Sequence, residues 1–232
     1  IAMIGIIGAM ASEVDGLKEL MENKTVDVIS GVEFCCGSIG GKNIVVAQAG
    51  VGKVNAAVTA QTMILKYNTK AIINIGVAGG INPTLNIGDI VIADRTVEHD
   101  MDTTAVGDAP GFITGIDRVY MDCDKEISEL MYQVSKDMGI HTIYGVVASG
   151  DIFVSEDSVR NKIANIFNGA AAEMEGGAIG HVCTMNNVPF AVLRAMSDCA
   201  NNDSVVDFPA FAQKAAKTSI EIITEFLKRY KG

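Results

Sequence analysis

The sequence predicts a single α/β domain, in which buried strands alternate with helices around a central sheet. Three observations support this. Short apolar runs of strand length recur along the chain, segments with apolar residues at helical spacing separate them, and no Pro/Ser-rich tract or charge block divides the 232 residues. A hydrophobic content of 49% is enough for one large core. The domain is expected to span residues 1–232, with Met3 as the native start and Ile1 and Ala2 as added residues.

The first part of the chain alternates between strands and helices. Residues 3–7 form an apolar run typical of a buried strand, and Ser12 is placed to cap a helix that ends near Met21. The turn at Gly40-Gly41 separates two of three short strands, as expected for hairpins. The strands predicted in this part cover residues 26–29, 33–38, 43–49, 71–75 and 89–93, and a second helix covers residues 53–67.

The second part opens with the longest irregular stretch, residues 99–118. Loops of that length in compact domains are usually functional or interfacial. A helix over residues 124–138 follows and ends at Gly139, a residue typical of helix C-caps. The remaining predicted strands cover residues 142–148, 170–172 and 190–193, and the remaining helices cover residues 155–166, 176–185 and 208–230.

Composition excludes several classes of protein. The chain has 18 Lys+Arg against 28 Asp+Glu, a formal net charge of -10, so its surface repels nucleic acids and anionic membranes. No apolar run reaches the roughly 20 residues of a membrane span, and the N-terminus lacks the pattern of a signal peptide. Five cysteines without Cys-x-x-Cys spacing are typical of reduced thiols, which predicts a cytoplasmic protein.

Two acidic clusters each follow a strand-like run. They are Ala-Glu-Met-Glu-Gly at 172–176 and Arg-Ala-Met-Ser-Asp at 194–198. Acids at the ends of neighbouring strands converge on one crevice, where Glu173, Glu175 and Asp198 with Arg194 suit a polyhydroxylated substrate that must be protonated to react. The alternative is a pair of helix N-caps. That alternative explains Asp198, but it does not explain two acids beside small residues.

The glycine-rich segments do not match nucleotide-binding fingerprints. Gly50-Val51-Gly52-Lys53 resembles part of a P-loop, but Ala47 replaces its first glycine and Val54 replaces the Ser/Thr that would hold magnesium. Residues 76–80 lack the Gly-x-Gly-x-x-Gly spacing of a dinucleotide fold. Two interpretations of residues 76–80 stay open, a floor that lets a ligand approach the backbone closely and a set of ordinary tight turns.

Metal and covalent chemistry are disfavoured. The run His99-Asp100-Met101-Asp102 has no second cluster of ligands and is interpreted as a solvated loop, so no metal or cofactor is expected. Three histidines without Gly-x-Ser-x-Gly argue against a Ser-His-Asp hydrolase. His181 is expected to be packed in a helix and hydrogen-bonded, His141 to lie at the surface, and Asp151 to lie in a turn.

Six segments in chain order carry a resemblance over essentially the whole sequence. The chain resembles the bacterial 5′-methylthioadenosine/S-adenosylhomocysteine nucleosidases of the purine nucleoside phosphorylase and uridine phosphorylase superfamily. The segments are Gly-Ala-Met-x-x-Glu-Val at 8–14, Gly-Val-Gly-Lys-Val at 50–54, Asn-Ile-Gly-Val-Ala-Gly-Gly at 74–80, Ser-Gly-Asp-x-Phe-Val at 149–154, Glu-Met-Glu-Gly at 173–176 and Arg-Ala-Met-Ser-Asp at 194–198.

This resemblance implies a twisted, mixed central sheet flanked by helices, and a homodimer. It implies hydrolysis of the N-glycosidic bond of methylthioadenosine, S-adenosylhomocysteine and 5′-deoxyadenosine, with adenine as one product. The expected partner is therefore a small adenine nucleoside, not a nucleic acid or a membrane.

The resemblance also implies residue roles. Asp198 would protonate the leaving adenine at N7, and Glu13 would activate water with help from Arg194. Glu175 and the Met174 backbone would hold the ribose hydroxyls, since a carboxylate accepts two hydrogen bonds. Other positions also match the family's binding site. Phe153 would stack on adenine, and the backbone of Val154 would contact its edge. The remaining matches are Gly79, Val77, Ala78 and Ser197 near the ribose and base, and Met10, Val51 and Phe208 around the 5′ substituent.

Two departures and three alternatives remain. Val77 stands where many members have Ser, and Val106 stands where some have an aromatic ring that crosses the dimer interface.

A phosphorylase would need a cationic phosphate site, but the chain has only five arginines. Asn74 occupies the position of a phosphate-binding Arg, and Glu13 would repel the anion. A hydrolase of another adenosine derivative, such as aminodeoxyfutalosine, would share the fold. A non-catalytic nucleoside-binding protein would not need the three carboxylates.

Overall fold

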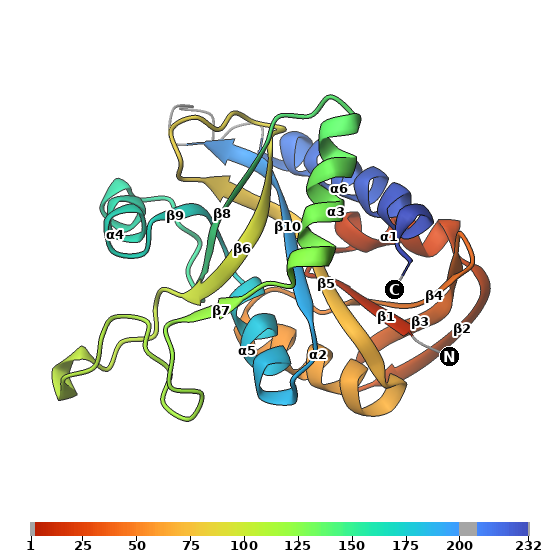
Figure 1. The fold of residues 1–232 in the computed structure, drawn as a ribbon, viewed down its shortest axis with the longest axis horizontal. Coiled ribbons are helices and arrows are strands. Elements are labelled where there is room, and N and C mark those ends of the chain that lie inside the picture. Colours follow the sequence, from red (N-terminus) through yellow and green to blue (C-terminus); the bar gives the residue numbers. More distant parts are fainter. Residues whose placement is uncertain (1–2, 200–207, 232) are drawn as a thin grey trace.

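A computed structural model describes residues 3–199 and 208–231 (Figure 1). Within them the helices are α1 (Ala11–Leu20), α2 (Lys53–Tyr67), the 3₁₀ turn η1 (Thr104–Val106), α3 (Lys125–Asp137), α4 (Asp157–Phe167), α5 (Gly176–Asn186) and α6 (Phe208–Arg229). The strands are β1 (Met3–Gly8), β2 (Glu22–Ile29), β3 (Val32–Ile39), β4 (Lys42–Gln48), β5 (Thr69–Gly80), β6 (Ile90–Glu98), β7 (Tyr120–Asp122), β8 (Thr142–Ser149), β9 (Gly169–Glu173) and β10 (Phe190–Cys199).

All the described strands belong to one mixed sheet with the order β10-β6-β8-β9-β5-β1-β4-β3-β2, and β7 pairs with β6. β10 also pairs in parallel with β5, so β5, β9, β8, β6 and β10 close into a ring. The exposed edge strand β2 carries charged side chains, which discourage pairing with another chain. The predicted single α/β domain with a mixed sheet flanked by helices is confirmed.

The helices cover both faces of the sheet. Helices α1, α3 and α6 pack over one face, whereas α2 and α5 pack together on the opposite side (Figure 1). The central strands are apolar on both sides, as Ile6 and Ile7 in β1 illustrate, because helices bury each face. Burial of one such side chain stabilises the fold by about 1.5–3 kcal/mol. None of the described helices is long and apolar enough to cross a membrane.

Several helix ends follow from side-chain chemistry. Asp124 is the N-cap residue of α3, and its Oδ1 accepts a hydrogen bond of 2.9 Å from the backbone N–H of Ile127. Gly139, with φ of 74°, follows this helix as predicted. The prediction for Ser12 is wrong. Met10 is the N-cap residue of α1, and the side chain that accepts a hydrogen bond at this helix start is Glu13, from the N–H of Met10.

Strand ends differ more from prediction than helix ends. β5 continues to Gly80 and β10 continues to Cys199, because residues 76–80 pair with β10 and their last two also pair with β9. The tight-turn interpretation of residues 76–80 is therefore wrong. β7 and η1 lie in or next to the stretch predicted to be irregular. The helix predicted over residues 155–166 begins two residues later, at Asp157.

Candidate active site

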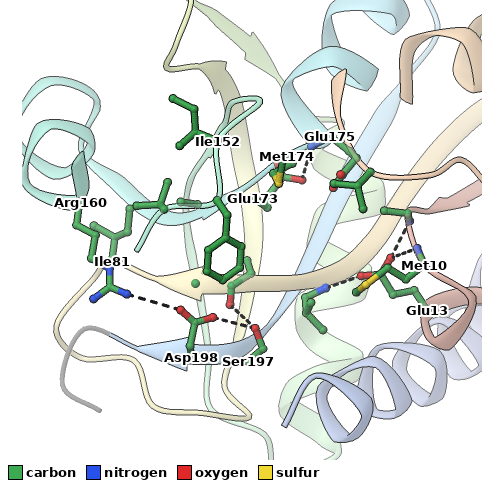
Figure 2. A pocket seen from close by; sticks show the side chains of 18 residues that line it. Met10, Glu13, Ile81, Ile152, Arg160, Glu173, Met174, Glu175, Ser197 and Asp198 are labelled. Carbon is green, nitrogen blue, oxygen red and sulfur yellow. Dashed lines mark hydrogen bonds and ion pairs between the residues drawn. The ribbon is translucent and has the colours of Figure 1, made fainter. Parts of the chain in front are cut away.

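A cavity of about 200 Å³ opens where β1, β5, β9 and β10 end (Figure 2). The loops before α2 and before α4 complete its walls. Figure 2 shows Glu13, Glu175 and Asp198 entering the cavity from different sides. The lining residues are Ala9, Met10, Glu13, Val51, Val77, Ala78, Gly79, Ile81, Ile152, Phe153, Val154, Arg160, Ala172, Glu173, Met174, Glu175, Ser197 and Asp198.

Glu13 is held in place by backbone N–H groups that lie just after β1 and within β5. Its Oε2 accepts hydrogen bonds from the N–H groups of Ala9, at 2.7 Å, and Met10, at 3.0 Å. Its Oε1 accepts one from the N–H of Val77 at 3.0 Å. The side chain is almost fully buried in the described structure, at 1% exposure. Glu13 is therefore a fixed carboxylate at the cavity wall.

Gly76 makes room for this carboxylate. A Cβ atom at position 76 would overlap Arg194 Nη1 and lie 2.6 Å from Glu13 Oε1, closer than real Cβ atoms approach such groups. The backbone of β5 thus passes directly beneath the two charged groups. The groups that approach this backbone closely are the protein's own side chains, and the approach of a ligand to residues 76–80 stays a prediction.

Arg194 lies in the middle of β10 and beneath the cavity. Its Nη2 donates to Glu173 Oε2 and to Asn74 Oδ1, and it lies 3.6 Å from Glu175 Oε2. Asn74 in turn donates to the carbonyl of Ile7 at 2.9 Å. A guanidinium buried to 1% exposure needs such partners, because an unpaired buried charge is costly.

Glu173 lies just before α5 and stabilises the start of this helix. Its carboxylate accepts hydrogen bonds from the Ser149 hydroxyl, from the N–H of Gly176 and from that of Glu175. It therefore caps the N-terminus of α5 while it neutralises Arg194. The helix-cap alternative from the sequence is right for this acid.

Glu175 is the second buried acid of the cluster and lines the cavity. Its Oε1 accepts a hydrogen bond of 2.9 Å from the N–H of Gly52. Burial and the neighbouring Glu173 carboxylate raise the pKa of Glu175 to about 7, against the opposing effects of Arg194 and the Gly52 N–H. Glu175 can therefore change its charge near neutral pH.

Asp198 lies in β10 and does not begin a helix, so the helix-cap alternative is wrong for this residue. Met196 pairs with Ala78 and Asp198 with Gly79, so Ser197 forms a bulge in β10. The bulge turns Ser197 and Asp198 toward the same cavity, although neighbours in a regular strand face opposite ways. The Ser197 hydroxyl donates to Asp198 Oδ1 at 3.0 Å.

The comparisons with known proteins cover the whole chain. Residues 3–228 match the family described as Phosphorylase superfamily. A 5′-methylthioadenosine/S-adenosylhomocysteine nucleosidase from Shewanella halifaxensis is 41% identical over 228 residues, which cover 97% of this chain and 99% of that protein. The chain belongs to this nucleosidase family within the phosphorylase superfamily.

Solved structures agree with this membership. An S-adenosylhomocysteine nucleosidase from Streptococcus pyogenes, in complex with 5-methylthiotubericidin, superposes with a TM-score of 0.94 at 35% identity and covers 100% of this chain and 98% of its own. The futalosine hydrolase of Helicobacter pylori has a TM-score of 0.93 at 32% identity, with 99% of both chains covered. The structural neighbours thus include proteins named for S-adenosylhomocysteine and for futalosine.

The structure brings most of the residues predicted from the family pattern to one place. Each of them lines the cavity except Arg194, which lies beneath it, and Phe208, whose side chain lies outside the described residues. Val77, where many nucleosidases have Ser, faces the cavity and donates its backbone N–H to Glu13. Val106, at the second departure, is 81% exposed.

Sequence reasoning missed several lining residues, and Arg160 is the most important of them. Its Nη2 lies 3.8 Å from Asp198 Oδ2 (Figure 2). Its Nη1 lies 3.7 Å from Asp157 Oδ1. An arginine in the first turns of a helix carries no local signal of a site. Ile81 and Ile152 were missed for the same reason, because apolar residues at the ends of elements are common.

The run at residues 99–102 was interpreted as solvated, and this is wrong for its first two members. His99 is buried to 5% exposure, and Asp100 forms an ion pair of 2.7 Å with Lys53. Two other predictions are confirmed, since His181 hydrogen-bonds to Glu98 at 2.9 Å and His141 is half exposed. Among the described residues, no group of three or more His, Cys, Asp or Glu side chains could hold a metal ion.

Proposed function

We propose that this chain hydrolyses the N-glycosidic bond of methylthioadenosine and S-adenosylhomocysteine, and also of 5′-deoxyadenosine. The products are adenine and the 5′-substituted ribose, as methionine salvage and recycling of S-adenosylmethionine by-products require. The observation that carries the proposal is the convergence of Glu13, Glu175 and Asp198 on one cavity in a chain whose relatives are named for this activity. Four cysteines, Cys35, Cys36, Cys123 and Cys183, are free, which fits a cytoplasmic enzyme.

The three acids suit the three tasks of the reaction. Cleavage passes through a ribose cation that resembles the oxocarbenium ion of glycoside hydrolysis. Asp198 protonates adenine at N7, so that the base leaves as a neutral molecule. Glu13 accepts a proton from the attacking water, and Glu175 accepts hydrogen bonds from the ribose hydroxyls. The separate placement of Glu13 and Asp198 in Figure 2 allows acid and base to act on different faces of one substrate.

The remaining lining residues suit a base and a 5′-thio group. Phe153 and Val154 lie in the loop before α4 and would contact adenine, whereas Gly79 provides the floor beneath it. Met10 and Val51 supply apolar surface for the 5′ substituent. Arg194 is already paired with Glu173, so it acts mainly as a fixed positive charge beneath the attacking water.

Phosphorolysis is disfavoured by the same geometry. Asn74 is buried in the middle of β5, where its amide donates to the Ile7 carbonyl and its oxygen accepts from Arg194, so it supplies no cationic group for phosphate. The fixed carboxylate of Glu13 would repel a phosphate ion at the position of the attacking water. A second candidate is hydrolysis of a futalosine-type nucleoside, which the Helicobacter pylori neighbour favours.

One incubation separates these activities. The protein is mixed with methylthioadenosine, with and without phosphate, and the sugar product is identified by mass spectrometry. We expect free methylthioribose at a rate that phosphate does not change. Formation of methylthioribose 1-phosphate would mean phosphorolysis. Cleavage of aminodeoxyfutalosine alone would move the chain to the second candidate.

We predict that the protein is a homodimer, in which residues 99–118 reach toward the 5′ pocket of the partner. Helices α2 and α5 pack together and expose apolar side chains, with Val54 at 73%, Leu65 at 75% and Met185 at 65% exposure. Sedimentation equilibrium should therefore give the mass of two chains. Replacement of Val54 and Leu65 by Lys should weaken the dimer. A fully active monomer would contradict the prediction.

A further inference from the structure

The N-terminus of α2 receives two carboxylates from distant parts of the chain. The N–H of Gly52 donates to Glu175 Oε1 at 2.9 Å, and the N–H of Lys53 donates to Asp151 Oδ1 at 2.8 Å. These are among the N–H groups that a helix start leaves without intrahelical partners. Gly52 has φ of 101°, which other residues rarely adopt, so the backbone before α2 is shaped to present both donors.

The side chain of Lys53 closes a ring around this helix start. Its ammonium group donates to Asp100 Oδ1 at 2.7 Å, and Asp100 Oδ2 accepts the N–H of Asp151 at 2.8 Å. Because Asp151 in turn accepts the Lys53 N–H, the three residues form a closed circuit, called here the Lys53 ring. The ring joins the start of α2, the segment after β6 and the loop after β8, which carries Phe153.

A second carboxylate anchors the ring to the protein interior. The Lys53 ammonium also donates to Glu98 Oε2 at 3.0 Å, and Glu98 Oε1 is 2.9 Å from His181 Nδ1 on α5. Burial would lower the pKa of Lys53, but the hydrogen bonds to Asp100 and Glu98 raise it above its usual value. Without this cation, two partly buried carboxylates would face each other with little compensation.

We propose that Lys53 is a positioning residue for Glu175, and that the Lys53 ring holds the Gly52 N–H against the ribose-binding carboxylate. Lys53 does not line the cavity, so it acts through the backbone and not on the substrate. The same ring fixes the loop that carries Phe153 and Val154 relative to the ribose site. The inference rests on the proposed function, because it gives Glu175 the ribose hydroxyls as ligands.

The proposal has a consequence for the pH dependence of catalysis. The groups that face Glu175 are Glu173 from β9, Arg194 from β10, Glu13 from α1 and the Gly52 N–H. Burial and the two acids raise the pKa of Glu175, whereas Arg194 and the Gly52 N–H lower it. Glu175 works as a carboxylate, so kcat/KM falls as the pH drops through its pKa. Loss of the Gly52 hydrogen bond raises that pKa and moves the acid limb to higher pH.

The test compares Lys53→Met with Lys53→Arg and with Lys66→Met, a matched exposed control on the same helix. The value of kcat/KM for methylthioadenosine is measured from about pH 5 to 9, the range in which acid and base groups titrate. We expect Lys53→Met to lose up to about 10²-fold in kcat/KM, as for a displaced catalytic geometry, and to shift the acid limb upward. Lys53→Arg should retain much of the wild-type kcat/KM and most of the wild-type position of the acid limb. Lys66→Met should match the wild type in both quantities.

Asp151→Ala is the second variant, since Asp151 is exposed and its removal leaves no buried charge unpaired. It should shift the acid limb in the same direction. Thermal melting shows whether Lys53→Met and Asp151→Ala fold. If the wild type is active and both folded variants keep the acid limb of the wild-type pH profile, the positioning role alone is overturned. A wild type that leaves methylthioadenosine intact would overturn the proposed function, and the positioning role with it.

Discussion

Glu13→Gln is expected to lower kcat for methylthioadenosine by about 10²–10⁴-fold, the loss typical of a removed general base. The amide has nearly the same shape as the carboxylate, but it cannot accept a proton from water. All three hydrogen bonds to Glu13 come from backbone N–H groups, which an amide NH₂ cannot accept. The variant therefore leaves at least one N–H without its partner, which destabilises the fold by about 1–3 kcal/mol.

The measurement must separate these two effects. Single-turnover kinetics with excess enzyme report the chemical step, calorimetry with adenine reports binding, and thermal melting reports the loss of stability. Glu19→Gln, an exposed change on the same helix, is the matched control. Adenine should still bind to Glu13→Gln. A variant that is folded and turns over at the wild-type rate would exclude Glu13 as the base.

Helices with clear local signals could be predicted from the sequence. The bounds of α2 match the prediction because apolar spacing marks its face and Asn68, in the left-handed region, ends it. Asn168 and Asn187 end α4 and α5 in the same way, and this signal was available but not used. β7 could not be predicted, since three residues are too few to show a period.

The predicted ends of β5 and β10 are wrong for a physical reason. Glycines and polar residues usually end a strand, but here Gly76 is needed so that the backbone can pass beneath Glu13 and Arg194. The bulge at Ser197 also depends on pairing with β5, which lies far away in sequence. Local propensity therefore gives the wrong end for each strand at the very place where the cavity forms.

In the candidate site too, some residues could be predicted from the sequence and others could not. The acids that carry the proposed chemistry could be predicted, because their motifs are short and lie in register with a family pattern. Arg160 and the Lys53 ring could not, since each depends on side chains that only the fold brings together. The sequence places Lys53 in a segment that fails as a P-loop and in one family segment, and neither assigns a role to its side chain, although its neighbour Gly52 contacts Glu175.

Asp198→Asn is expected to slow the chemical step by about 10²–10⁴-fold while it keeps much of the affinity for substrate. The asparagine amide can still donate a hydrogen bond to N7, but it cannot transfer a proton. Ser197 donates to Oδ1, so the other oxygen is the one available to the purine, and Arg160 is its ionic neighbour at 3.8 Å. At that distance, with both side chains partly exposed, the ion pair contributes little and can yield to a bound base.

A 7-deaza analogue of methylthioadenosine makes the complementary change in the substrate, because it lacks the nitrogen that accepts the proton. The wild type should bind the analogue but cleave it at a rate reduced by a similar factor. Removal of both partners should cost little more than removal of either, since one proton transfer is lost in every case. Asp157→Asn, which alters the other ionic partner of Arg160, should leave turnover unchanged. If Asp198→Asn is nearly fully active, or if the analogue is cleaved at the rate of methylthioadenosine, the proton does not come from Asp198.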